Sequence, residues 1–305
     1  MGRELASVAC HDGPVTTLRF GSSPSVIYSG GIDGAIRQWV WNESGHVDRT
    51  AQLRQGRGNV STLQIDSESK VLFSGYSDGR IEVVPLTSDA SLEVLDQHSD
   101  FVSAIVQHPR ERLFVSGSYD GNLSVWEYPG GTECGVLEDP HGGPITGVAF
   151  DTSGEVFATS GLRSPVFLWN THELTRRGER GNGSSTIVGL KFVPLSDQLV
   201  TVGYTGPVCV YEAEAEEPDI RIQLDESGDY PMAMDDQGTK IAIGTDSSVN
   251  VYDRSTGALL GCHRSLDSGV FAVEFVPQTD AIAVGCGNGE IRVIDPTSEP
   301  TSPSQ

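Results

Sequence analysis

Three stretches of the sequence carry residue types that could take part in catalysis. The segment "GYSDG", residues 75–79, has the G-x-S-x-G spacing of a nucleophile elbow, which would make Ser77 the nucleophile of an esterase. The segment "YSGGIDGAIRQW", residues 28–39, places Asp33 in an Asp-Gly turn, where the carboxylate could do chemistry or hold the turn. The segment "GCGNGE", residues 285–290, is glycine-rich, as phosphate-binding loops are.

None of these stretches has the surroundings that its chemistry requires. A nucleophile elbow needs a helix after the serine, whereas an alternating, strand-like run follows Ser77. "GCGNGE" has the wrong glycine spacing, no lysine and no following helix pattern. The seven histidines are scattered without metal-ligand spacing, and no H-E-x-x-H, paired cysteine or EF-hand loop occurs. We therefore expect no catalytic residue, no metal and no cofactor.

The stretch around Asp33 is one copy of a repeat of about 42 residues. The other copies are "FSGYSDGRIEVV" (73–84), "VSGSYDGNLSVW" (115–126), "ATSGLRSPVFLW" (158–169), "VTVGYTGPVCVY" (200–211), "IAIGTDSSVNVY" (241–252) and "IAVGCGNGEIRV" (282–293). Each copy contains short alternating runs separated by turns, as in "PVTTLRF" (14–20), "VIYSGG" (26–31), "AIRQW" (35–39) and "VDRTAQLR" (47–54). Four short antiparallel strands per repeat predict an all-β fold, a seven-bladed β-propeller.

The two ends of the sequence complement each other. The seventh copy ends in "PTSEPTSPSQ", residues 296–305, whose prolines and small polar residues predict disorder rather than a fourth strand. The segment "RELASVAC", residues 3–10, precedes the first copy and could supply that strand. We expect the N-terminal strand to complete the last blade and close the ring, so that residues 1–295 form a single domain.

These repeats resemble the WD40-repeat family over residues 3–295. In that family a blade carries a His, a Ser or Thr, an Asp and a Trp that are linked by hydrogen bonds. Two copies match at the same separations of 18, 4 and 6 residues: His11, Ser29, Asp33 and Trp39, then His98, Ser116, Asp120 and Trp126. Because buried polar groups that satisfy one another avoid a large desolvation cost, we expect these eight residues to be structural rather than catalytic.

The other copies depart from this pattern. Copy two keeps Ser74 and Asp78, but Gly56 stands in the place of the histidine and Val84 in that of the tryptophan. Copy four keeps three of the residue types, as His141, Ser160 and Trp169, but its turn "LRSP" contains no aspartate. Copies five to seven keep only a glycine, the alternation and a terminal Tyr211, Tyr252 or Ile294.

Composition limits the classes of partner. A formal charge of −22 disfavours binding to nucleic acid or to anionic membranes. The acidity could reflect a solvated surface or could attract a basic partner. The sequence has no 18-residue apolar run and no secretory signal. Its five cysteines are widely spaced and include no C-x-x-C pair, which argues against disulfides and a zinc site. We expect a cytoplasmic protein, with a nuclear location left open.

The resemblance implies that partners bind on the rim where the first strands begin and the tight turns protrude. The flanking residues of the first strands are Pro14, Thr16, Asn59, Ser61, Phe101, Ser103, Pro144, Thr146, Thr186, Val188, Gly228, Tyr230, Gly269 and Phe271. Aromatic and arginine residues dominate many interfaces, although each of these could instead pack within the blades. The predicted partner-binding residues are Phe101, Tyr119, Tyr76, Arg163, Tyr204, Tyr230 and Phe271.

The sequence thus predicts a non-catalytic interaction scaffold or complex subunit, a monomeric propeller within a larger complex, that binds a protein or peptide. One alternative is a reader or chaperone of basic, histone-like tails. Another, from a different class, is a propeller-based hydrolase with a carboxylate cluster in the channel. A basic island in residues 174–185, with Arg176, Arg177 and Arg180, is expected in the outer strand and loop of blade four, and a partner contact there is left open.

Overall fold

The protein is all-β. The computed structural model describes residues 2–41, 47–66, 68, 70–87, 92–181, 185–212, 215–224, 228–264, 266 and 268–296. These residues form 28 strands in seven four-stranded antiparallel sheets, and they contain no helix, so none that could span a membrane. The predicted all-β fold of seven four-stranded blades is confirmed. Residues 297–305, nearly all of the predicted disordered tail, lie outside the described residues.

The chain divides into two compact units, which we describe separately. Unit 1 comprises Met1–Arg57 and Tyr230–Gln305, and unit 2 comprises Gly58–Asp229. We number the sheets as blades 1 to 7 in chain order. Unit 1 contains blade 1, with β2 (Val15–Phe20), β3 (Val26–Gly31), β4 (Ala35–Trp41) and β5 (Val47–Gln55); blade 6, with β22 (Met232–Met234), β23 (Lys240–Gly244), β24 (Ser248–Asp253) and β25 (Leu259–Arg264); and blade 7, with β26 (Val270–Phe275), β27 (Ile282–Cys286), β28 (Glu290–Asp295) and β1 (Arg3–Ala9).

Unit 2 contains the remaining four blades, each formed by four consecutive strands. Blade 2 has β6 (Val60–Asp66), β7 (Val71–Tyr76), β8 (Ile81–Pro85) and β9 (Glu93–Leu95); blade 3 has β10 (Val102–Gln107), β11 (Leu113–Ser118), β12 (Leu123–Glu127) and β13 (Thr132–Leu137); blade 4 has β14 (Ile145–Phe150), β15 (Val156–Gly161), β16 (Val166–Asn170) and β17 (Arg176–Arg180); blade 5 has β18 (Ile187–Phe192), β19 (Leu199–Gly203), β20 (Val208–Tyr211) and β21 (Ile220–Ile222).

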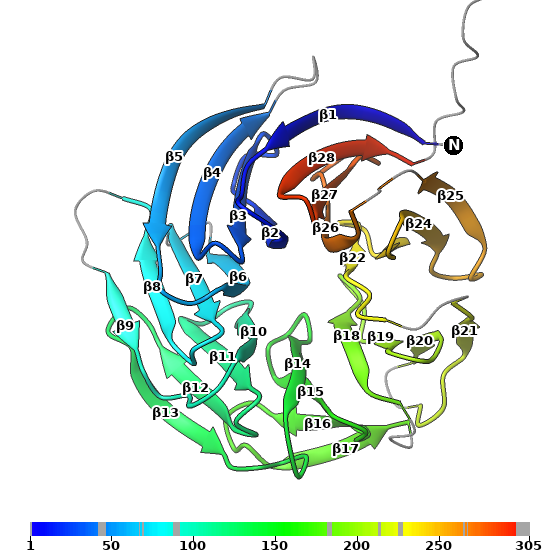
Figure 1. The fold of residues 1–305 in the computed structure, drawn as a ribbon. Coiled ribbons are helices and arrows are strands. Elements are labelled where there is room, and N and C mark those ends of the chain that lie inside the picture. The colour runs from blue at the N-terminus through cyan, green and yellow to red at the C-terminus, as the bar shows by residue number, and fades with distance from the viewer. Residues whose placement is uncertain are drawn as a thin grey trace, which may run out of the picture. The chain divides into compact units, whose positions relative to one another are not determined.

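The N-terminal strand completes blade 7. β1 pairs antiparallel with β28, from Arg3 opposite Asp295 to Ala9 opposite Glu290. In Figure 1 the blue β1 lies along the red β28, so the first and last strands of the chain share one sheet. This pairing covers the outer edge of β28, which would otherwise present unpaired backbone groups. The prediction that residues near the N-terminus supply the missing strand is confirmed.

Apolar clusters lie between neighbouring sheets within each unit. In unit 2, Phe73 and Ile81 of blade 2 pack with Phe114 and Trp126 of blade 3. In unit 1, Trp39 of blade 1 belongs to the same cluster as strand residues of blade 7. The second strands are buried on both faces, which explains their continuous runs of apolar and small residues.

A β-bulge marks the start of the first strand in six of the seven blades. The register shifts there by one residue, and the extra residue has no partner on the second strand. These extra residues are Thr16, Ser61, Ser103, Thr146, Val188 and Phe271. A bulge changes the direction in which the side chain of its extra residue points. The backbone geometry of the bulge therefore determines the side-chain directions of these six residues of the predicted rim.

Candidate functional site

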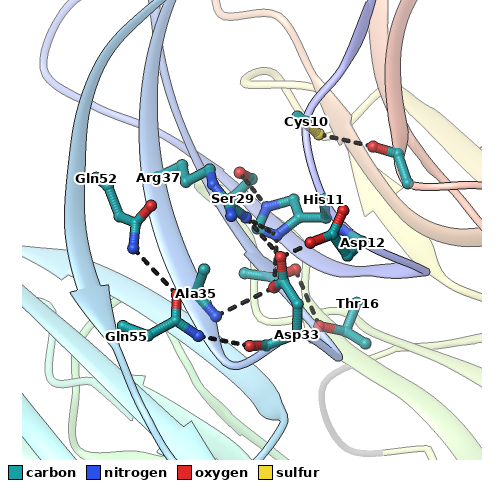
Figure 2. A network of polar contacts seen from close by, with 12 residues as sticks. Cys10, His11, Asp12, Thr16, Ser29, Asp33, Ala35, Arg37, Gln52 and Gln55 are labelled. Atoms are coloured by element: carbon teal, nitrogen blue, oxygen red, sulfur yellow. Dashed lines mark hydrogen bonds and ion pairs between the residues drawn. The ribbon is translucent and has the colours of Figure 1, made fainter.

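A chain of buried hydrogen bonds runs through blade 1. Trp39 Nε1 donates to Ser29 Oγ at 2.9 Å, and Ser29 Oγ lies 2.8 Å from His11 Nε2. His11 Nδ1 lies 2.8 Å from Asp33 Oδ1, and the two side chains point toward each other (Figure 2). Because Ser29 accepts the indole proton, its own proton is available to His11 Nε2, which leaves the Nδ1–H of the imidazole to donate to Asp33. This direction of donation satisfies all four side chains, and Arg37 Nη1, which also lies 2.6 Å from His11 Nδ1, then donates to Asp33 rather than to the imidazole.

Arg37 adds a positive charge at the aspartate end of this chain (Figure 2). Its Nη1 donates to Asp33 Oδ2 at 2.7 Å, and the backbone amide of Ala35 donates to Oδ1 at 3.1 Å. Burial alone would raise the pKa of Asp33, but hydrogen bonds from Arg37 and His11 outweigh it and lower that pKa to about 2. Burial lowers the pKa of His11, so the imidazole is neutral at neutral pH.

Blade 3 repeats the arrangement without an arginine. Trp126 Nε1 donates to Ser116 Oγ at 2.9 Å, and this oxygen lies 2.8 Å from His98 Nε2. His98 Nδ1 lies 3.0 Å from Asp120 Oδ2, and Asp120 Oδ1 accepts the backbone amide of Asn122 at 2.9 Å. The four predicted side chains are thus brought together in blade 3, as they are in blade 1.

Blade 4 contains a related network, but its hydroxyl is not the predicted one. His141 Nε2 lies 2.7 Å from Thr159 Oγ1, which also accepts from Trp169 Nε1 at 2.8 Å. The assignment of this role to Ser160 is wrong, because neighbouring residues of a strand point to opposite faces. Ser164 Oγ, 2.6 Å from His141 Nδ1, takes the place of the aspartate.

The geometry does not present these serines to a substrate. Ser29 and Ser116 are 0% exposed, and each hydroxyl lies between an indole and an imidazole. Ser77, the possible esterase nucleophile, accepts the backbone amide of Asn59 and is followed by the strand β8 rather than by a helix. Among the described residues, no group of three or more His, Cys, Asp or Glu could hold a metal ion.

In blade 2 a tyrosine takes the space that histidine occupies elsewhere. In blades 1 and 4 a histidine side chain lies directly against a glycine. A Cβ added to Gly31 would lie 2.5 Å from His11 Nδ1, and a Cβ added to Gly161 would lie 2.6 Å from His141 Cβ. Tyr76 holds the equivalent position, opposite the first residue of its first strand. It is 0% exposed, so its prediction as a partner-binding residue is wrong.

The hydroxyl of Tyr76 donates to the buried carboxylate of Glu82 at 2.9 Å. We expect Tyr76→Phe to lower the free energy of unfolding by about 1–3 kcal/mol, because it removes a donor to a buried charged acceptor. Urea unfolding measures this change. Tyr204→Phe, the same substitution at an exposed tyrosine, is the control, and an equal loss in both variants would contradict the role of Tyr76.

Large apolar side chains are exposed on the tight turns of blades 3, 4 and 5. In each blade the residue that begins the turn donates its backbone amide to the residue preceding the first strand, as in Tyr119 to Phe101, Leu162 to Pro144 and Tyr204 to Thr186. Their exposed fractions are 45% for Tyr119, 55% for Leu162 and 43% for Tyr204. The first strands of these blades pack side by side within unit 2.

Phe101 extends this surface, because its ring lies 4.9 Å from that of Tyr119. We refer to Phe101, Tyr119, Leu162 and Tyr204 as the turn surface. Sequence reasoning found three of these four residues and missed Leu162, having chosen its neighbour Arg163, which is also exposed. The position in the repeat could have identified Leu162, because Tyr119, Leu162 and Tyr204 each directly follow the last residue of the second strand.

The remaining predicted rim residues have mixed placements. Tyr230, at 4% exposure, is buried, so its prediction as a partner-binding residue is wrong. Phe271, in unit 1, is 48% exposed and lies over Gly287, where a Cβ would be 2.9 Å from its ring. The hydroxyls of Ser61 and Ser103 donate to Val102 O and Ile145 O, which ties neighbouring first strands together. These two serines are therefore structural.

Acidic groups lie beside the turn surface. The pKa of Tyr119 is raised by burial and then by the charges of Asp229 and Asp100. Asp100 is exposed and accepts the backbone amide of Phe101 at 2.7 Å. The turn surface therefore combines aromatic and aliphatic groups with negative charge, a combination that suits a ligand with apolar and basic side chains.

The architecture of seven four-stranded blades is that of a β-propeller. The crystal structure of the WD40 β-propeller domain of Doa1 is similar over 96% of both chains, with a TM-score of 0.83 and 20% sequence identity. The family model "WD domain, G-beta repeat" matches residues 2–40 and 90–127, which include the two complete His–Ser–Asp–Trp sets. The resemblance to the WD40-repeat family is therefore confirmed.

Curated relatives match part of the chain. WD repeat-containing protein SL1-17 of Schistosoma mansoni is 28% identical over 191 residues, which are 61% of this chain and 62% of the relative. Cilia- and flagella-associated protein 52 of Homo sapiens is 23% identical over 197 residues, 64% of this chain and 31% of the relative. The chain thus matches less than two thirds of these relatives' own length. WD40 propellers are in general non-catalytic scaffolds for protein interactions.

Proposed function

We propose that this protein is an interaction scaffold that binds a peptide or protein segment, carrying apolar and basic side chains, on the turn surface of unit 2. The observation that carries the proposal is the exposure of Tyr119, Leu162 and Tyr204 at equivalent turn positions of three consecutive blades. Aromatic side chains in the centre of an interface contribute a large share of binding free energy.

Charge supports the basic character of the ligand. The exposed carboxylate of Asp100 accepts the backbone amide of Phe101 in the turn surface, and the whole chain carries a formal charge of −22. Attraction between exposed charges is screened by salt, with a Debye length of about 8 Å at physiological ionic strength. The affinity for the ligand should therefore fall as the salt concentration rises.

Peptides selected from a random library on the full chain provide a defined ligand for the test. We expect Tyr119→Ala with Tyr204→Ala to weaken binding of the selected peptide by at least about 30-fold, as expected when interface anchors are truncated. Isothermal titration calorimetry measures the affinity. The midpoint of thermal unfolding should change little, because both side chains are already exposed.

Leu195→Ala is the matched control, since Leu195 is an 85% exposed apolar residue of unit 2 that lies between β18 and β19, away from the turns. The proposal predicts no loss of affinity in this variant. Equal losses in the control and in the turn variant, or selected peptides without basic and apolar residues, would contradict it.

A further inference from the structure

The three exposed apolar residues of the tight turns are evenly spaced. Tyr119, Leu162 and Tyr204 each directly follow the second strand of blades 3, 4 and 5. Apolar clusters pack blade 3 against blade 4 and blade 4 against blade 5. Because sheets that pack face to face lie about 10 Å apart, equivalent positions of neighbouring blades are separated by about the same distance. The turn surface therefore repeats an apolar group about every 10 Å.

The turn of blade 4 is fixed to that of blade 5 through Thr186. The backbone amide of Arg163, the residue after Leu162, donates to Thr186 Oγ1 at 3.3 Å. The carbonyl oxygen of Thr186 accepts the backbone amide of Tyr204 at 2.8 Å. One residue thus binds both turns and holds Leu162 and Tyr204 in a fixed relation.

The turn of blade 3 meets blade 4 at a pair of glycines. A Cβ added to Gly121, in the turn of blade 3, would lie 3.5 Å from Gly143 O. Gly143 directly precedes Pro144, whose carbonyl oxygen accepts the backbone amide of Leu162 at 3.1 Å. No described atom lies within 4 Å of a Cβ added to Gly142 or Gly143. The backbone between these two turns is therefore accessible to a ligand.

A repeat of about 10 Å distinguishes the conformations that a bound peptide could adopt. In a polyproline II (PPII) helix, side chains three residues apart share one face and lie about 9 Å apart. Side chains on one face of a β-strand lie about 7 Å apart, so successive ones fall out of step with the turns. An α-helix reaches about 10 Å only at a separation of seven residues, and its side chains in between would lie over Gly142 and Gly143, which offer none to contact.

We propose that the segment bound on the turn surface is proline-rich and adopts a PPII conformation, with apolar side chains three residues apart that contact Tyr119, Leu162 and Tyr204. This inference rests on the proposed function and specifies its ligand. A basic residue at one end of the segment would meet Asp100, which is exposed and hydrogen-bonded to the backbone of Phe101.

The chemistry of the turn surface suits such a ligand. Aromatic side chains recognise PPII segments in other proteins, where the preformed helix lowers the entropy lost on binding. The backbone carbonyl groups of a PPII helix form no internal hydrogen bonds, so they can accept from the hydroxyls of the exposed Tyr119 and Tyr204.

The probe is a synthetic proline peptide that carries an arginine at each end and three leucines, each three residues from the next. The control peptide has the same composition, but its leucines stand two residues apart. We expect the probe to bind the full chain with a dissociation constant of about 100 μM or tighter, and the control peptide to bind at least about tenfold more weakly. Isothermal titration calorimetry measures both affinities. Equal affinities would overturn the inference.

Leu162→Ala tests the register at the central turn, whichever way the peptide runs. It should weaken binding of the probe by about fivefold or more, as should alanine in place of the probe's central leucine. The two changes together should weaken binding no more than either alone, because they remove the same contact. Leu195→Ala, the matched control at another exposed leucine, should leave the affinity unchanged. Losses that multiply, as for independent sites, would overturn the inference.

The outcomes separate this inference from the proposed function. Library-selected peptides that depend on Tyr119 and Tyr204, together with a probe that binds no better than an alanine-based helical peptide with leucines seven residues apart, would overturn the inference and leave the proposed function standing. Selected peptides that bind equally well without those two tyrosine side chains would contradict both. Circular dichroism identifies any variant that fails to fold, and the comparison of peptides on the unmodified protein then decides the outcome.

Discussion

Replacing Ser116 by alanine is expected to lower the free energy of unfolding by about 2–4 kcal/mol, because two buried polar groups lose their partner at once. Ser116 is 0% exposed, and its Oγ accepts from Trp126 Nε1 and lies 2.8 Å from His98 Nε2. The cost should exceed that of a single lost hydrogen bond, since both the indole and the imidazole remain buried. Urea unfolding followed by tryptophan fluorescence and circular dichroism measures it.

Ser7→Ala is the matched control for this change. Ser7 is an exposed residue of β1, and its replacement should alter the free energy of unfolding by less than about 0.5 kcal/mol. Ser29→Ala should behave like Ser116→Ala, because blades 1 and 3 have the same geometry around the hydroxyl. If the Ser116 variant were as stable as the control, the structural role of the network would be contradicted.

Acid is expected to destabilise the protein between about pH 6.5 and pH 4 through His141. Burial, and then the charge of Arg176, lowers the pKa of His141 from 6.5 to about 4. Its ring is stacked on Phe167 at 4.5 Å, and Arg176 lies 3.7 Å above the same Phe167 ring. Its Nδ1 faces the hydroxyl of Ser164, whereas His11 and His98 face aspartates.

The direction of this effect follows from proton binding. Between about pH 6.5 and pH 4 the unfolded chain takes up a proton at His141 and the folded chain does not, so stability falls as the pH falls through this window. Below about pH 4 both states are protonated and His141 adds no further loss. The loss is at most about 3 kcal/mol and is reduced by the partial exposure of the ring.

Ser164→Asp tests this account by giving His141 the carboxylate that blades 1 and 3 possess. We expect a smaller loss of stability between pH 6.5 and pH 4 than in the unmodified protein, measured as the midpoint of urea unfolding across that range. Ser164→Ala removes the hydroxyl without adding charge and should not reduce the loss. The same pH dependence in the Asp and Ala variants would contradict the assignment.

Asp33 affects stability in a lower pH range. Its pKa is lowered in the folded state to about 2, so its contribution to stability is complete above about pH 4 and is lost only as the pH falls toward 2. Loss of stability above pH 4 is therefore not due to Asp33.

The fold and the two complete His–Ser–Asp–Trp networks could be predicted from the sequence, because both follow from the regular spacing of the repeat. The separations of 18, 4 and 6 residues identify the four side chains of blades 1 and 3 that the structure brings together. The same spacing of 18 from His141 leads to Thr159, and choosing Ser160 by residue type gave the wrong face of the strand. Spacing was the better guide because side chains along a strand alternate between faces.

Packing that replaces a lost residue could not be predicted from spacing. Tyr76 is buried because blade 2 lacks an imidazole, and this depends on contacts with residues such as Glu82 that follow no repeat rule. In the turns, Leu162 and Arg163 are adjacent, and the backbone hydrogen bond of Leu162 to Pro144 shows that Leu162 is the residue equivalent to Tyr119. The residues missed or misplaced are thus those at which the copies diverge from one another.

Hydrogen–deuterium exchange of the full chain with a selected peptide tests the proposed function most directly. The proposal predicts that the peptide slows exchange in the segments around Tyr119, Leu162 and Tyr204, the tight turns of blades 3 to 5. Exchange around Leu195 should be unchanged. Protection confined to outer strands such as β13 or β17, with none at the three turns, would contradict it.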